Sequence, residues 1–180
     1  MYNTLPTLAL VLGGANSGKS SFAERLVAFS GKTKVYVATA QAFDTEMEAK
    51  IDAHKIARGA DWTVIEAPHE LKHSLAGATS DQMLLIDCAT MWLTNRMLAE
   101  ADLEAEAAEL LQAVSASKAS VVVVSNEVGL GIVPDTSLGR AFRTAQGRLN
   151  QQLAAQADLA IFIAAGLPLV LKGTLPEGFA

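Results

Sequence analysis

The 180-residue chain has only one cysteine, Cys88, so no disulfide can form within a single copy. Such sparing use of cysteine agrees with a reducing compartment, and we expect a cytoplasmic protein. The N-terminus lacks a charged region followed by a long apolar stretch, since the apolar run 8–12 is too short for a signal peptide. No run of about 18 apolar residues occurs, so we expect no membrane span.

Long basic blocks are also missing, and the formal net charge is −5. We therefore expect no nucleic-acid partner. No internal repeat or low-complexity tract occurs, and the length predicts one domain spanning 1–180. Hydrophobic residues make up 51% of the chain, which is enough for a sizeable core. Pro176 and Gly178 predict a loose tail over 174–180.

Short apolar runs alternate with helical patterns along the chain. The runs predict strands near 7–12, 34–38, 62–66, 83–87 and 120–125, and the helical patterns lie near 19–29, 46–56, 69–77, 90–116 (which a break could divide) and 137–156. A last pair of runs, 159–164 and 168–172, predicts a C-terminal hairpin. The alternation predicts an α/β fold with a doubly wound, mostly parallel sheet. Ligands of such sheets bind outside the carboxyl ends of the strands.

The most informative motif follows the first apolar run and reads Gly13-Gly14-Ala15-Asn16-Ser17-Gly18-Lys19-Ser20. It matches the phosphate-binding pattern G-x-x-x-x-G-K-[ST] between a strand and a helix, which predicts a P-loop NTPase-like domain. The glycines let backbone N–H groups point at an anion, and Lys19 reaches the β- and γ-phosphates. The Ser20 hydroxyl suits Mg²⁺. A glycine-rich turn that merely caps a helix is the alternative, which the flanking strand and helix disfavour.

A second metal ligand is suggested at Asp87, where the apolar run 83–86 ends in a carboxylate. An acid at such a strand end holds or orients Mg²⁺ in P-loop proteins. The alternative is a cap for the helix that begins near Thr90.

Three basic residues share one face of the predicted helix 46–56 and its extension: Lys50, His54 and Arg58 at intervals of four. Such a row repels itself unless an anion lies there, and it disfavours protonation of the imidazole. A neutral imidazole nitrogen could attack phosphorus and carry a nucleotidyl or phosphoryl group. The alternative is a solvated charged face. His69 and His73 also share a predicted helical face, and we interpret them as surface histidines.

A polar segment, Ser125–Pro134, follows the Val-rich run 121–124 and should lie at the ligand edge of the sheet. Asn126 and Glu127 could bind substrate or help to orient the attacking group. The alternative is that this segment is only a turn after a polar strand end.

Taken in order, these segments resemble the bifunctional adenosylcobinamide kinase / adenosylcobinamide-phosphate guanylyltransferase family of cobalamin synthesis. The resemblance covers about residues 8–172. It rests on Gly13–Ser20, on Tyr36–Gln41, on Glu46, Met47, Ile51, His54 and Arg58, on Asn126–Pro134, and on Gly147–Gln151. The phosphate loop alone would not identify the family; the histidine segment and the Asn-Glu-Val-Gly loop, in this order, are specific.

The resemblance implies that ATP or GTP phosphorylates adenosylcobinamide, and that GMP from GTP is then transferred to adenosylcobinamide phosphate. It also implies a homotrimer. Matching positions assign the guanylylated histidine to His54, the triphosphate loop to Gly13–Ser20, and GTP contacts to Thr39, Ala40, Gln41, Lys55, Ile56, Ala57, Arg58, Glu66 and Asp87. Together with the residue-based interpretation, this gives Lys19 and His54 as catalytic residues, Ser20 and Asp87 as Mg²⁺ ligands, and GTP and ATP as substrates.

Two other functions remain open from the sequence. One is a P-loop small-molecule kinase without the transferase step. The other is a GTP-binding switch protein, although no Asn-Lys-x-Asp guanine-reading sequence occurs.

Overall fold

A computed structural model describes residues 5–41 and 61–179. Seven strands in these residues form one sheet of order β3-β2-β4-β5-β1-β6-β7. All neighbouring strands pair in parallel except β6 and β7, which form an antiparallel hairpin. The strands are β1 (Leu8–Gly13), β2 (Thr33–Ala38), β3 (Trp62–Glu66), β4 (Gln82–Asp87), β5 (Ser120–Asn126), β6 (Leu159–Ala164) and β7 (Leu167–Lys172). The mostly parallel sheet and the C-terminal hairpin confirm the predicted fold class.

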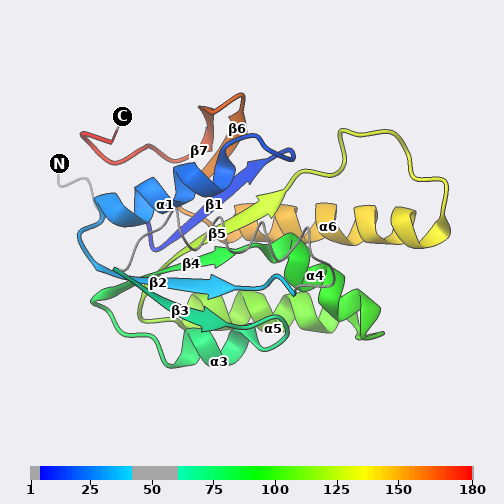
Figure 1. The fold of residues 1–180 in the computed structure, drawn as a ribbon, viewed down its shortest axis with the longest axis horizontal. Coiled ribbons are helices and arrows are strands. Elements are labelled where there is room, and N and C mark those ends of the chain that lie inside the picture. The colour runs from blue at the N-terminus through cyan, green and yellow to red at the C-terminus, as the bar shows by residue number, and fades with distance from the viewer. Residues whose placement is uncertain (1–4, 42–60, 180) are drawn as a thin grey trace.

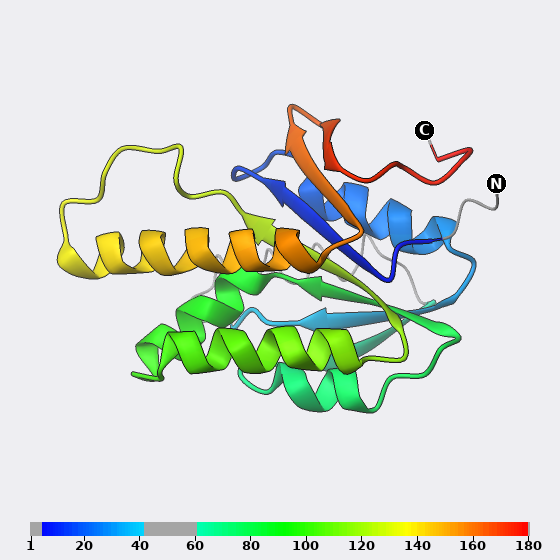
Figure 2. The ribbon, with the colours of Figure 1, turned by 180° about the vertical axis from the view of Figure 1, so that it is seen from behind.

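Helices cover both faces of this sheet (Figure 1). They are α1 (Lys19–Phe29), α3 (Leu71–Ala76), α4 (Ala89–Leu98), α5 (Leu103–Ala116) and α6 (Ser137–Gln156). Helix α1 lies on one face, and α5 and α6 lie side by side on the other, as Figure 2 shows from behind. None of the helices in the described part of the chain is long and apolar enough to cross a membrane.

Strand β5 is buried on both faces, which is what a continuous apolar run such as 121–124 predicts for a strand of a parallel sheet. Val121 and Val123 belong to the apolar cluster with α3–α6, whereas Val122 and Val124 belong to the cluster with α1. Each is at most 1% exposed. This alternation along β5 assigns every side chain of the strand to one of the two faces.

The helical pattern over 90–116 forms two helices, α4 and α5. Glu100 between them has φ of +57°, which interrupts the helical backbone. Asp102 then caps α5, because its carboxylate accepts hydrogen bonds from the N–H groups of Glu104 and Ala105. The predicted helix 46–56 lies outside the described residues.

The C-terminal segment, expected to be loose, lies against α1. The ring of Phe179 makes edge contacts with Phe22 and Phe29, with centroids 5.3 and 5.4 Å apart. The Arg25 guanidinium lies 5.7 Å from the centre of the same ring. Aromatic and cation–π contacts thus hold this segment although it has no regular secondary structure.

Candidate nucleotide site

The phosphate loop connects β1 to α1 at the carboxyl edge of the sheet. Two of its residues have left-handed backbone conformations: Asn16 with φ of +54° and Gly18 with φ of +93°. The N–H of Ser17 donates to the Gly14 carbonyl at 3.3 Å, which closes the turn. The Lys19 ammonium donates to the same carbonyl at 3.0 Å and so lies over the loop. This arrangement places a fixed cation beside the N-terminus of α1, where phosphates bind.

The hairpin turn between β6 and β7 supports this loop from the side. The N–H of Gly166 donates to the Ser17 carbonyl at 2.9 Å. A Cβ atom on Gly18 would lie 3.3 Å from the Gly166 Cα, so the two backbones approach closely. The loop is therefore held by β1, α1 and the hairpin together.

Gly13 is sterically required at the start of the loop. A Cβ atom there would lie 2.7 Å from the Ile163 carbonyl oxygen and would also collide with the Ser17 hydroxyl. We expect Gly13→Ala to lower the free energy of unfolding by about 1–3 kcal/mol, because backbone atoms must shift. Urea denaturation measures this loss.

Gly14→Ala is the matched control, because a Cβ atom at Gly14 meets nothing within 4 Å. We expect it to change the free energy of unfolding by less than about 0.5 kcal/mol. Equal losses in both variants would contradict the steric argument.

Two carboxylates lie on the same face of the sheet as α1. Asp87 and Glu66 are both in register with Ala38 of β2, so the three residues form one row across β4, β2 and β3. The Tyr36 hydroxyl donates to Asp87 Oδ2 at 3.2 Å. Tyr36 packs in the apolar cluster with α1, which fixes the face to which Asp87 points. The sheet thus places the phosphate loop, Asp87 and Glu66 at the carboxyl ends of the strands, on the face that carries α1.

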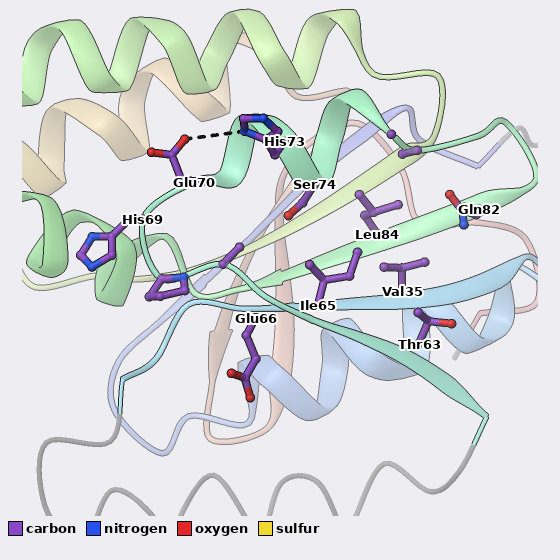
Figure 3. Close-up of a pocket in the computed structure, with 14 residues that line it drawn as sticks. Val35, Thr63, Ile65, Glu66, His69, Glu70, His73, Ser74, Gln82 and Leu84 are labelled. Atoms are coloured by element: carbon purple, nitrogen blue, oxygen red, sulfur yellow. Dashed lines mark ion pairs between the residues drawn. The ribbon is translucent and has the colours of Figure 1, made fainter.

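A groove of about 510 Å³ lies on the opposite face, between α3 and the edge strands (Figure 3). Val35, Ile65 and Leu84 form its floor. In Figure 3 the Glu66 carboxylate points away from these side chains and from α3, toward the face that carries α1. Glu66 therefore belongs to the nucleotide edge although its backbone borders the groove.

Thr39 binds two strand ends together. Its hydroxyl donates to the Cys88 carbonyl and accepts from the Cys88 N–H, both at 2.7 Å. The Asn95 amide of α4 donates to the carbonyls of Thr39 and Pro68, each at 2.9 Å. The Thr39 side chain, with 0% exposure, therefore fixes the backbone that leads into Ala40 and Gln41.

The single cysteine is not a nucleophile in this site. Burial and the neighbouring Asp87 charge raise the pKa of the Cys88 thiol to about 11. The thiol is therefore neutral at physiological pH, whereas thiol chemistry requires the thiolate.

Comparison with known sequences identifies the family. Residues 9–171 match the sequence profile of the family "Cobinamide kinase / cobinamide phosphate guanyltransferase". The chain belongs to this family. It is 43% identical over 167 residues to the "Bifunctional adenosylcobalamin biosynthesis protein CobP" of Pseudomonas aeruginosa, covering 91% of this chain and 96% of that protein. It is also 36% identical over 181 residues to the corresponding CobU protein of Escherichia coli, covering 92% and 99%.

Solved structures at low identity confirm the fold of this family member. The RadB recombinase aligns with a TM-score of 0.56 at 18% identity, covering 97% of this chain and 85% of that one. A type III secretion ATPase aligns with a TM-score of 0.52 at 10% identity, covering 91% and 56%. At such low identity the two structures support only the P-loop NTPase-like fold.

Some predicted site residues of this cobinamide kinase family member lie outside the described residues. They are His54, Lys55, Ile56, Ala57 and Arg58. The described part of the predicted set comes together at one edge: the phosphate loop, Thr39–Gln41, Glu66 and Asp87.

Of the two other histidines, His73 agrees with the predicted surface position and His69 does not. Helix α3 begins at Leu71, so His69 precedes it and does not share a helical face with His73. His69 is partly buried; its carbonyl accepts from the Trp92 indole at 3.1 Å, and its Nε2 lies 3.4 Å from Gln41 Nε2. The His73 side chain is 88% exposed, which confirms a surface position.

The donor set at the edge fits Mg²⁺. The available ligands are a hydroxyl at Ser20 and a carboxylate at Asp87, both hard oxygen donors. Within the described residues no group of three or more His, Cys, Asp or Glu side chains could hold a metal ion. A sparse protein set of this kind is typical of Mg²⁺ bound mainly through substrate phosphates.

Sequence reasoning missed several residues that shape the site. Asn95 carries no local motif, and only the folded contacts reveal it. The sequence leaves Glu127 open as a substrate-binding or orienting residue or as part of a turn; in the structure its Oε1 accepts from the Gly129 N–H at 2.5 Å and closes a turn. Arg143 of α6 donates to the Gly129 carbonyl, so α6 also holds this turn.

Proposed function

We propose that this chain performs both reactions of its family at one nucleotide site, with a guanylylated histidine as the covalent intermediate. It phosphorylates adenosylcobinamide with ATP or GTP. It then transfers GMP from GTP to adenosylcobinamide phosphate, giving adenosylcobinamide-GDP and pyrophosphate. The observation that carries the proposal is the shared edge of the phosphate loop and the Glu66–Asp87 row, in a chain that matches the family over residues 9–171.

In the kinase step, the substrate hydroxyl oxygen attacks the γ-phosphorus while the bond to the β–γ bridging oxygen breaks. The nucleoside diphosphate leaves, and the hydroxyl proton passes to solvent or a base. Lys19 offsets charge on the transferred group and the leaving oxygen. Mg²⁺, held by Ser20 and Asp87, would supply further charge neutralisation on the β- and γ-phosphates.

In the transferase step, a His54 ring nitrogen attacks the α-phosphorus of GTP and pyrophosphate leaves from the phosphate loop. A phosphate oxygen of adenosylcobinamide phosphate then attacks the guanylyl phosphorus, the P–N bond breaks, and His54 is regenerated. Covalent catalysis thus divides one difficult transfer between two anions into two easier steps. Lys50, Lys55 and Arg58 would screen the repulsion between the anions.

We also propose a cytoplasmic homotrimer, the assembly that the family resemblance implies. Two exposed apolar surfaces support self-association. Strand β7 exposes Leu167, Leu169 and Leu171, and the loop before α6 exposes Ile132 at 96% and Leu130 at 80%. Light scattering at micromolar concentration tests the mass, for which three copies are expected.

GTP labelled at the α-phosphate tests the covalent step directly. We expect the purified protein with Mg²⁺ to take up label that is stable in base and lost in acid, as for a phosphoramidate. GTP labelled at the γ-phosphate should leave no such label. Absence of α-label in active protein would overturn the guanylyl-histidine.

The same assay distinguishes the two alternative functions, a kinase without the transferase step and a switch protein. Both relatives are named as bifunctional proteins, which favours neither alternative. A kinase without the transferase step would transfer γ-label to adenosylcobinamide but form no α-labelled protein. A switch protein would hydrolyse GTP slowly, with no effect of adenosylcobinamide.

A further inference from the structure

We propose that Asn126 contacts the γ-phosphate of the bound nucleotide, and that a buried polar network of Ser125, Gln146 and Asn150 positions it there. The inference rests on the proposed nucleotide site and adds residues to it. It also gives a role to Asn126 and Asn150, which lie in the segments Asn126–Pro134 and Gly147–Gln151 that the reaction steps above do not use.

The position of Asn126 between the phosphate-binding elements is the first argument. Strand β5 lies between β4, which ends in Asp87, and β1, which ends in the phosphate loop. Asn126 is in register with Gly13, and Glu127 N–H donates to the Gly13 carbonyl at 3.1 Å. Asp87 is in register with Val124, so Asn126 extends two residues beyond it. A ligand that bridges the loop and Asp87 must therefore pass the end of β5.

The alternation along β5 directs the Asn126 side chain to the correct face. Val122 and Val124 pack on the α1 face, and Asn126 continues that series. Ser125 belongs to the opposite series with Val121 and Val123, on the face covered by α6. The amide of Asn126 thus faces the side of the phosphate loop.

The backbone of Asn126 is fixed from two neighbouring helices. Its N–H donates to the Thr90 hydroxyl of α4 at 2.8 Å. Its carbonyl accepts from Asn150 Nδ2 of α6 at 3.1 Å. Its side-chain amide, in contrast, forms no hydrogen bond with any residue in 5–41 or 61–179. A rigid backbone with an unused amide at the ligand edge is suited to ligand contact.

The network behind Asn150 fixes its orientation. Asn150 Oδ1 accepts from the Ser125 hydroxyl at 2.6 Å and from Gln146 Nε2 at 3.0 Å. Gln146 Nε2 also donates to Ser125 Oγ at 2.9 Å. Ser125 and Gln146 are 0% exposed and Asn150 is 6% exposed. Because both donors hold Oδ1, the Nδ2 group of Asn150 must point at Asn126.

An uncharged amide donor suits this position. It can donate to a γ-phosphate oxygen without adding charge beside Lys19, and hydrogen bonds to charged groups are the stronger ones. GDP lacks the γ-phosphate, so the contact should favour triphosphate over diphosphate. The ratio of the two affinities is therefore the quantity to measure.

The experiment compares calorimetric binding of GDP and of a GTP analogue with a non-hydrolysable β–γ bridge, both with Mg²⁺. We expect Asn126→Ala to weaken the triphosphate about tenfold while GDP changes less than about twofold. Asn150→Ala should lower the same ratio by about three- to tenfold, because the Asn126 backbone loses its α6 anchor. Equal loss for both nucleotides, or no loss, in Asn126→Ala would overturn the proposal.

Leu153→Ala is the matched control for destabilisation of α6. Leu153 is 0% exposed in the same helix but lies outside the network. It should lower the unfolding midpoint in urea and leave the triphosphate-to-diphosphate ratio unchanged. A ratio that falls equally in Leu153→Ala and Asn150→Ala would overturn the positioning role. Failure of the wild-type protein to bind either nucleotide would instead overturn the proposed function, and this inference with it.

Discussion

Lys19→Ala is expected to lower kcat/KM for phosphorylation of adenosylcobinamide by at least about 10²- to 10³-fold. The Lys19 ammonium lies over the phosphate loop, held by the Gly14 carbonyl. In the reaction it would meet negative charge that develops on the γ-phosphoryl group and the bridging oxygen. A methyl group offers neither charge nor a donor. Transfer of label from γ-labelled ATP to adenosylcobinamide measures the effect.

The fold should tolerate this change, so the loss can be assigned to chemistry. Lys19 is partly exposed and makes one hydrogen bond in the described structure. Lys118→Ala is the matched control, because Lys118 is exposed between α5 and β5. It thus lies at the amino-terminal end of β5, away from the phosphate loop. This variant should retain wild-type kcat/KM. A loss of less than about tenfold in Lys19→Ala would contradict the role of this ammonium.

Lys19→Ala should also reduce formation of the guanylyl-protein. In the proposed transferase step pyrophosphate leaves from the same loop, and its departing charge would lose the same cation. The two activities are thus expected to fall together in this variant. Separate losses would indicate two nucleotide sites.

His54→Ala is expected to remove the guanylyltransferase activity and to leave the kinase activity. Covalent α-label and GMP transfer should fall by at least about 10³-fold, since the proposed nucleophile is gone. Phosphorylation of adenosylcobinamide should remain within a few-fold of wild type, because the proposed γ-phosphate reaction depends on Lys19 and not on His54. Parallel assays with α- and γ-labelled GTP measure both on one preparation.

The other histidines provide the control. His73→Ala removes a side chain that is 88% exposed, so it should keep wild-type label and wild-type transfer. Label that persists in His54→Ala would place the covalent bond on another residue. Loss of phosphorylation together with transfer would show that His54 serves the nucleotide site as a whole.

The sequence predicts those parts of the site that local chemistry dictates. The phosphate loop has an unusual glycine spacing, and Asp87 ends an apolar strand, so both can be located without coordinates. Strand alternation also assigns the buried side chains of β5 to one face of the sheet or the other. These features depend on neighbours in the chain.

Other parts depend on contacts between distant segments. Asn95 reaches Thr39 and Pro68 across 56 and 27 positions, and Gly166 reaches Ser17 from the far end of the chain. The break at Glu100 and the contact of Phe179 with α1 are likewise decided by tertiary packing. No local propensity encodes such contacts, so only the folded structure reveals them.

The hairpin turn that supports the phosphate loop has one more consequence. Gly166 donates to the Ser17 carbonyl, while all residues of β7 beyond this turn are exposed. If the proposed trimer buries β7, nucleotide binding to the loop and burial of the strand act on the same turn. By thermodynamic reciprocity, any effect of nucleotide on subunit association is matched by an equal effect of association on nucleotide affinity. A nucleotide affinity that varies with protein concentration, over the range in which subunits associate, would reveal this coupling.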